Sequence, residues 1–217
     1  MRGFLIFSSY LKMPAFFIQS IAKNKIEFKE ITHFTSTLLA GITLYSIAFL
    51  CFYIYSQAFN SSWMYDDHQN LAGLSKIHSL ESALIFITSG GSGPLGRPVS
   101  LASFLLNIPD WPSNTFSFKR INVLIHLLNA FLLTKVLLQI SYILKSKITQ
   151  PIWFSVITAC IWMVHPFLAS TSLMSIQRMT LLSATFCLLG IITYLHGRFL
   201  LHKTKYFGLL WMSLGIG

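Results

Sequence analysis

Residues 34–56 read FTSTLLAGITLYSIAFLCFYIYS and contain no charged side chain. A helix needs about 20 consecutive apolar residues to cross a bilayer's hydrocarbon core, which is about 30 Å thick. This run is long enough, so it predicts a membrane-spanning helix. In lipid the backbone polar groups must be satisfied within the segment, and that favours an all-helical fold.

The composition of the whole chain agrees with a membrane location. Hydrophobic residues make up 54% of the sequence and charged residues 10%, and the mean hydropathy is +0.64. Such a chain has too few polar side chains to cover the surface of a water-soluble protein of this size. We therefore expect an all-α integral membrane protein, a polytopic helical bundle.

Three further apolar runs predict additional spans, at residues 121–144, 152–169 and 179–196. In the first of them Asn122, His126 and Asn129 are spaced by four and three, so they fall within about a 60° arc of one helical face. We expect that face to meet protein or water and not lipid.

The carboxyl-terminal part, residues 121–217, is thus expected to hold spans two to five. The fifth begins near Tyr206 and is still apolar at Gly217, where the sequence stops. A helix that ends inside a bilayer leaves carbonyls unsatisfied. This pattern predicts an amino-terminal fragment of a longer protein or a truncated gene product, which would be inactive if the chain ends there.

The distribution of lysine and arginine predicts the orientation of the spans. Basic residues precede the first span and follow the second and fourth, at Arg2, Lys12, Lys23, Lys25, Lys29, Lys145, Lys147, Arg198, Lys203 and Lys205. We expect a cytoplasmic amino terminus, in which residues 1–33 form a cytoplasmic and interfacial segment and not a signal peptide. The net charge of +10 then reflects topology and attraction to the inner leaflet, and nucleic-acid binding is not expected.

Residues 57–120 are expected to form a long loop on the opposite, periplasmic side. Residues 74–88 mix apolar and charged side chains in a way that suits a short interfacial helix. The stretch 89–98 reads SGGSGPLGRP and ends in Arg97, which the following proline favours in an extended conformation. A glycine-rich segment followed by an arginine is compatible with either a mobile loop or a phosphate-binding site. The sequence contains no Walker-type pattern that would decide between them.

The adjacent acids Asp66 and Asp67 are the first candidates for chemistry, because the chain holds only six acidic residues. Asp66 has a second interpretation, as the cap of a helix that starts near Asp67. With Arg97, the polar stripe of the second span and the residues His165, Gln177 and Arg178, these acids can gather at one outer-leaflet interface.

Several of these residues also have structural interpretations. His126 suits a core histidine bonded to Asn122 or to a backbone carbonyl. Pro166 suits the end or a kink of a helix, and Arg178 can extend to lipid headgroups.

The order and spacing of five motifs resemble a known family. They are DDHQNL at 66–71, GPLGRPVSLASF at 93–104, NVLIHLLN at 122–129, HP at 165–166 and QRMT at 177–180. Residues 65–198 are similar to the amino-terminal membrane region of bacterial tetratricopeptide-repeat membrane proteins, which are related to the protein O-mannosyltransferase class of GT-C fold. Residues 1–217 show no 34-residue repeat of their own.

The resemblance implies a GT-C-like glycosyltransferase of the bacterial inner membrane. It would transfer a sugar from a polyprenyl-phosphate donor to a protein or glycan acceptor on the periplasmic side. Asp66 would be the base, with Asp67 as a second acid, and Arg97 and Arg178 would bind the donor phosphate. The remaining polar residues, His126, His165, Asn122, Asn129 and Gln177, would support the donor site.

The alternatives are a non-catalytic membrane scaffold, an inactive relative of the same fold and, less favoured, a transporter. Transporters place charges near the midplane on broken helices, whereas here the polar groups lie near the outer ends of the spans. No metal-binding residues are predicted, and participation of a divalent metal stays open.

Overall fold

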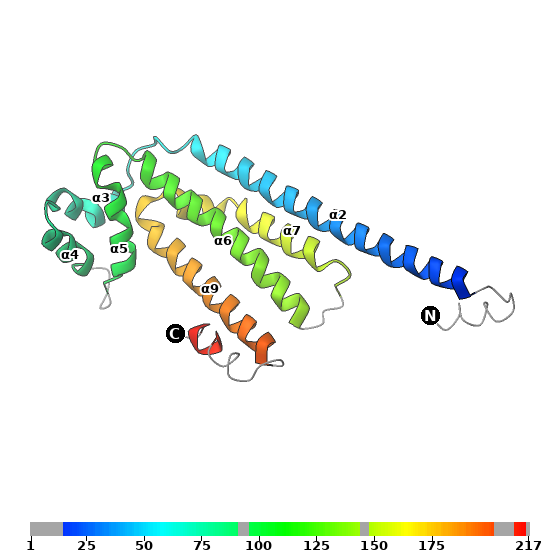
Figure 1. The fold of residues 1–217 in the computed structure, drawn as a ribbon. Coiled ribbons are helices and arrows are strands. Elements are labelled where there is room, and N and C mark those ends of the chain that lie inside the picture. The colour runs from blue at the N-terminus through cyan, green and yellow to red at the C-terminus, as the bar shows by residue number, and fades with distance from the viewer. Residues whose placement is uncertain (1–14, 91–95, 144–147, 202–210, 216–217) are drawn as a thin grey trace. The chain divides into compact units, whose positions relative to one another are not determined.

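The computed structural model describes residues 15–90, 96–143, 148–201 and 211–215, with the side chains of 15–29 and Tyr65 left aside. Within these residues the regular structure is helical throughout and contains no strand (Figure 1). The chain divides into two compact units, residues 1–42 and 43–217. All the sites discussed below lie in the second unit.

Three helical segments are long and apolar enough to cross a membrane: Glu30–Ser56, Phe116–Ile143 and Ser175–Leu201. The first belongs to α2 (Ala15–Ser56), the second is α6, and the third combines η3 (Ser175–Gln177) with α9 (Arg178–Leu201). The first, second and fourth predicted spans are therefore confirmed as apolar helices of spanning length. Of the predicted fifth span only residues 211–215 are described, and they are helical.

The third predicted span is not one straight helix. It consists of α7 (Pro151–Met163) and α8 (Phe167–Leu173), which meet at an angle of 68°. The break coincides with Pro166, which lacks a backbone donor and disfavours the helical conformation in the residue before it. The expectation that this proline ends or kinks a helix is confirmed. Among the described residues the number of candidate spans is three, or up to four if the bent pair counts as one span.

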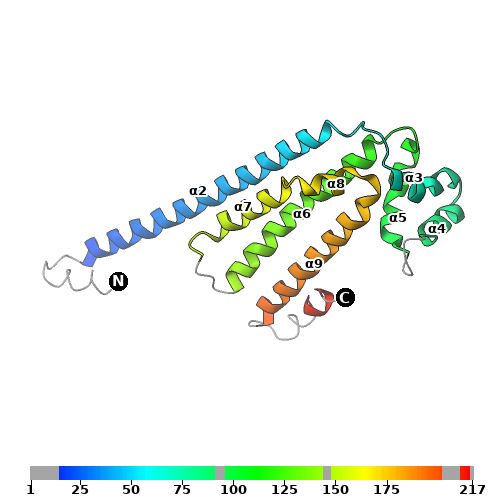
Figure 2. The ribbon, with the colours of Figure 1, turned by 180° about the vertical axis from the view of Figure 1, so that it is seen from behind.

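The segment between α2 and α6 is a cluster of short helices and not an open loop (Figures 1 and 2). It contains α3 (Tyr65–Leu71), η1 (Ala72–Lys76), α4 (Leu80–Thr88), α5 (Pro98–Phe104) and η2 (Leu105–Asp110). The helix predicted at 74–88 is interrupted because Ser79 caps α4: its hydroxyl accepts from the Ser82 amide at 3.2 Å, and the Ser82 hydroxyl accepts from the Ser79 amide at 2.9 Å.

Two buried clusters hold this arrangement together, and α6 contributes to both. One joins the end of α2 to α6 and α7, through Ala48, Cys51, Tyr55, Phe59, Val123, Leu127, Ala130 and Met163. The other lies under the short helices and contains Leu71, Leu74, Phe86, Leu101, Phe104, Phe118 and Ile176. Helix α6 therefore connects the span core to the short-helix cluster.

The polar stripe of α6 faces protein, as its spacing predicted. Asn122, His126 and Asn129 are all fully or almost fully buried. The His126 ring nitrogen lies 2.9 Å from the Met163 carbonyl oxygen at the end of α7. Asn129 donates to the Leu181 carbonyl at 2.9 Å and accepts from the Thr185 hydroxyl at 2.7 Å, so it binds α6 to α9.

This pairing predicts the effect of Asn129→Leu, which keeps the branching of the side chain at Cγ and removes both hydrogen bonds. We expect a loss of about 1–2 kcal/mol in the free energy of unfolding, measured by denaturant titration in detergent, because interhelical hydrogen bonds in membranes contribute in that range. Thr134→Val is the matched control, since the buried Thr134 hydroxyl bonds only within its own helix. Equal stability of the two variants would contradict an interhelical role for Asn129.

Candidate functional site

Asp67 is a structural residue at the start of α3. It is completely buried, and its two carboxylate oxygens accept from backbone amides. One accepts from Met64 at 3.0 Å and the other from Ile176 at 2.8 Å. The first bond closes the amino terminus of α3, and the second ties α3 to the segment that leads into α9. Asp67 was predicted as a second catalytic acid, but both of its oxygens are occupied by the backbone.

Asp66 is exposed to solvent on the same helix. It does not cap α3, because the helix begins at Tyr65 and Met64 is the N-cap residue. The interpretation of Asp66 as a helix cap was therefore wrong. Its backbone carbonyl accepts from the Asn70 side chain at 2.8 Å. By helical register Asp66, Gln69 and Asn70 lie within about 100° of arc on α3.

Arg178 is completely buried where α9 begins. Its guanidinium lies 4.3 Å from the ring centre of Phe104 and 5.7 Å from that of Phe118. It donates to side-chain oxygens of Asn122 at 2.9 Å and Asn107 at 2.8 Å, and to the carbonyl oxygens of Ser103 at 3.0 Å and Phe118 at 3.2 Å.

All of these hydrogen-bond partners of Arg178 are neutral protein oxygens. Sequence reasoning expected this arginine at a lipid phosphate or among lipid headgroups. In the structure it instead clamps α5 and η2 to α6 and α9.

Arg97 is the exposed arginine of the predicted pair. Its backbone is left-handed, with φ 59° and ψ 51°, and not extended as predicted from the following proline. Gly96 before it also has positive φ, at 67°, which glycine adopts without steric cost. Pro98 then opens α5, a position for which its fixed φ is suited. The two left-handed residues turn the chain sharply, with the arginine at the turn.

The two ends of the glycine-rich stretch, at Gly90 and Gly96, lie close together beside Arg97. A Cβ atom added to Gly90 would lie 2.0 Å from the Gly96 carbonyl oxygen. The two glycines therefore bring the ends of this stretch together at a distance that no other residue at position 90 permits. Residues 91–95 between them lie outside the described residues.

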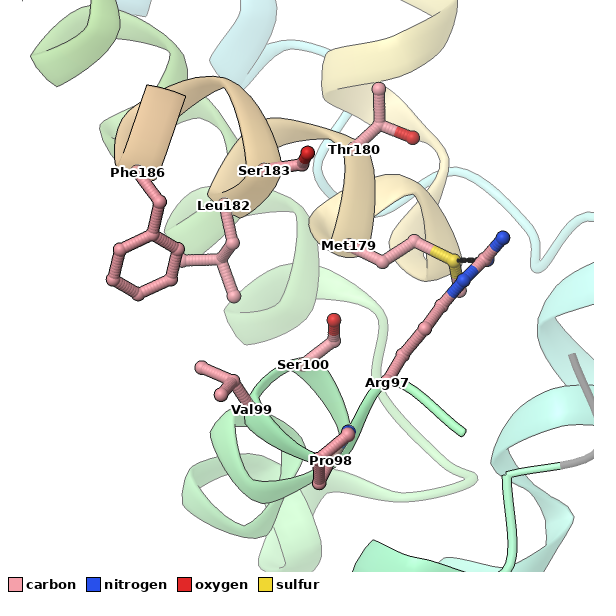
Figure 3. A pocket seen from close by; sticks show the side chains of 9 residues that line it. All are labelled: Arg97, Pro98, Val99, Ser100, Met179, Thr180, Leu182, Ser183 and Phe186. Carbon is pink, nitrogen blue, oxygen red and sulfur yellow. Dashed lines mark hydrogen bonds between the residues drawn. The ribbon is translucent and has the colours of Figure 1, made fainter. Parts of the chain in front are cut away.

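A pocket of about 400 Å³ opens between α5 and α9, and we call it the α5–α9 pocket. Figure 3 shows its lining residues: Arg97, Pro98, Val99, Ser100, Met179, Thr180, Leu182, Ser183 and Phe186. Arg97 lies at one end with its guanidinium against the Met179 sulfur. Phe186 is two helical turns further along α9, about 10 Å away by helical rise. The pocket thus has one cationic end and a mainly apolar lining, part of which belongs to α9, a helix of spanning length.

A second pocket of about 360 Å³ lies on the other side of Arg97, and we call it the α3–α5 pocket. Its lining comprises Gln69, Asn70, Gly73, Phe86, Ser89, Gly90, Gly96, Arg97, Ser100, Leu101, Ile176 and Met179. It shares Arg97, Ser100 and Met179 with the α5–α9 pocket. Sequence reasoning missed Gln69, Asn70, Ser100 and Met179, although the helical register from Asp66 could have indicated the first two.

The other predicted site residues also form hydrogen bonds within the protein. Asn122 donates to the carbonyl oxygens of Met174 and Ser175, besides accepting from Arg178. His165 is exposed at the break between α7 and α8, and its ring nitrogen accepts from the Phe167 amide at 3.3 Å. Gln177 accepts from the Thr180 hydroxyl at 2.6 Å. In the described part of the chain, no three His, Cys, Asp or Glu side chains come together as a metal site would require.

No protein-family model, curated protein or solved structure matches this chain. The resemblance to GT-C glycosyltransferases therefore stays a prediction.

The unequal burial of the adjacent acids predicts unequal effects of the same substitution. Asp67→Asn should lower the free energy of unfolding by about 1–3 kcal/mol. The asparagine side chain keeps only one of the two acceptor oxygens, so one buried backbone N–H group loses its hydrogen-bond partner. Asp66→Asn is the matched control and should change stability by less than about 0.5 kcal/mol. Denaturant titration of both variants measures the difference, and a stable Asp67→Asn protein would refute the structural role.

Proposed function

We propose that this membrane protein transfers a sugar from a polyprenyl-phosphate donor to a protein or glycan acceptor, with Asp66 as the base. In this proposal the protein lies in the bacterial inner membrane, with its amino terminus in the cytoplasm and residues 57–120 in the periplasm. It takes its reaction class from the motif resemblance. The observation that carries it is the position of Arg97 between one apolar pocket and one polar pocket.

The α5–α9 pocket suits an amphiphile with a phosphate headgroup. An arginine binds phosphate strongly through paired, charge-assisted hydrogen bonds, and Arg97 is the exposed cation at the pocket's end. Leu182 and Phe186 continue from it along a helix of spanning length. A lipid phosphate can therefore place its charge at Arg97 and its hydrocarbon chain beside α9.

Asp66 and Arg97, the two exposed charged residues of the proposed site, each have one role in this reaction. As the acceptor oxygen attacks the anomeric carbon, its proton passes to the Asp66 carboxylate. A bond forms between that oxygen and the anomeric carbon, and the bond from this carbon to the phosphate oxygen breaks. The lipid phosphate leaves with the electron pair, and Arg97 stabilises its negative charge.

A non-catalytic scaffold is the second candidate, and one observation favours it. Asp67, Arg178, Asn122, Asn129 and His126 were all candidates for the site, and all five form hydrogen bonds that hold helices together. A protein that keeps the packing of a fold without its chemistry would retain these residues. It would have no requirement for Asp66 or Arg97.

Two substitutions separate these functions. In membranes that contain the variants, Asp66→Asn should lower transfer of labelled sugar by about 10²–10⁴-fold, the usual contribution of a general base. Arg97→Ala should weaken binding of the lipid donor by about tenfold or more, because a charge-assisted bond is lost.

Glu81→Gln and Arg120→Ala are the matched controls, since both residues are exposed in the same segment and line neither pocket. Both should behave as the unmodified protein. Full transfer activity in Asp66→Asn would refute the base, and unchanged donor affinity in Arg97→Ala would refute the phosphate site. Loss of neither function would favour the scaffold.

A further inference from the structure

The α3–α5 pocket differs in chemistry from its neighbour. Gln69 and Asn70 line it from α3, and the hydroxyl-bearing residues Ser89 and Ser100 line it from the ends of α4 and α5. Amides both donate and accept hydrogen bonds, and so do hydroxyls. The lining therefore includes polar, uncharged side chains from three elements, α3, the end of α4 and α5, together with Arg97, which also lines the α5–α9 pocket.

The remaining wall of this pocket is apolar and contains an aromatic ring. Phe86 and Leu101 belong to the buried cluster under the short helices and also line the pocket. A Cβ atom added to Gly73 would lie 2.7 Å from the Phe86 ring. The glycine thus lets the ring lie directly against the η1 backbone. Hydroxyl-binding groups facing an apolar wall match a sugar ring, which has polar edges and an apolar C–H face.

The charge of the lining limits the kind of sugar. Among the described residues that line the pocket there is no aspartate or glutamate, and Arg97 is their one charged member. None of the described lining residues is a carboxylate that could pair with the ammonium of a cationic amino sugar, so its burial carries an uncompensated desolvation cost. Neutral sugars carry no such cost, and the carboxylate of a uronic acid can accept hydrogen bonds from amides and hydroxyls. Single sugars are also small enough for a pocket of about 360 Å³.

We infer that the α3–α5 pocket binds the sugar of a lipid-phosphate donor, that Gln69 and Asn70 select it, and that the selected sugar is neutral or acidic. This inference rests on the proposed function. It follows from the shared lining: a phosphate at Arg97 has the α5–α9 pocket on one side for its lipid and the α3–α5 pocket on the other. Asp66 lies one turn before the lining residue Asn70 on the same side of α3.

Binding of three defined probes tests the inference: farnesyl phosphate, farnesyl phosphoryl glucose and farnesyl phosphoryl glucosamine. Native mass spectrometry of the full chain in detergent measures their affinities. The unmodified protein should bind the glucose probe about tenfold more tightly than farnesyl phosphate, as expected for one or two additional hydrogen bonds. The glucosamine probe should bind no better than farnesyl phosphate.

Two variants connect the preference to the pocket. Gln69→Ala with Asn70→Ala should abolish the preference for the glucose probe and keep the affinity for farnesyl phosphate. Asn60→Ala removes an exposed amide that lies before α3 and lines neither pocket, so it should keep the preference. Gln69→Glu preserves shape and adds a carboxylate, so it should raise the affinity for the glucosamine probe relative to the glucose probe by about tenfold.

The outcomes separate this inference from the proposed function. Equal binding of farnesyl phosphate and the glucose probe, with both lost in Arg97→Ala, would overturn the sugar pocket and leave the phosphate site intact. An unchanged preference in the double variant would overturn the role of Gln69 and Asn70. No binding of any probe by the unmodified protein would overturn the pocket and the proposed function together.

Discussion

The buried guanidinium of Arg178 is the constraint on which the site depends. A buried charge without hydrogen bonds costs many kcal/mol, and here no carboxylate is among its bonding partners. The cost is offset by oxygens from three elements, α5, η2 and α6, and by the faces of Phe104 and Phe118. Because these oxygens must all point at one group, the start of α9 has a fixed position beside α5. Those two helices are the walls of the α5–α9 pocket.

A second constraint acts from the opposite side of the short helices. Asp67 accepts from the Ile176 amide, two residues before Arg178, and so holds α3 against the same segment. Both Asp67 and Arg178 have an exposed counterpart of the same sign. Asp66 precedes Asp67 in the chain, and Arg97 lies at the start of α5, across the α5–α9 pocket from α9. Burial thus divides four charges into two that build the site and two that remain available for a ligand.

Sequence patterns predicted the features that depend on local periodicity and failed for those that depend on distant partners. Hydropathy located the spans, the spacing of Asn122, His126 and Asn129 indicated a buried face, and Pro166 indicated the break. Arg178 was misinterpreted because its partners lie 56 to 75 residues away in the chain. The conformation of Arg97 was mispredicted because the preceding glycine and the start of α5 override the preference set by Pro98. The choice between Asp66 and Asp67 depended on where α3 begins: the helix starts at Tyr65, two residues before the expected start at Asp67.

Reaction of the folded protein with phenylglyoxal, followed by peptide mass spectrometry, tests most directly whether Arg97 is accessible and Arg178 is buried. In native membranes Arg97 should be modified and Arg178 should stay unmodified until the protein is denatured. Added farnesyl phosphate should protect Arg97. Modification of Arg178 at the rate of Arg97 in the folded protein would contradict the buried clamp, and with it the position of the site.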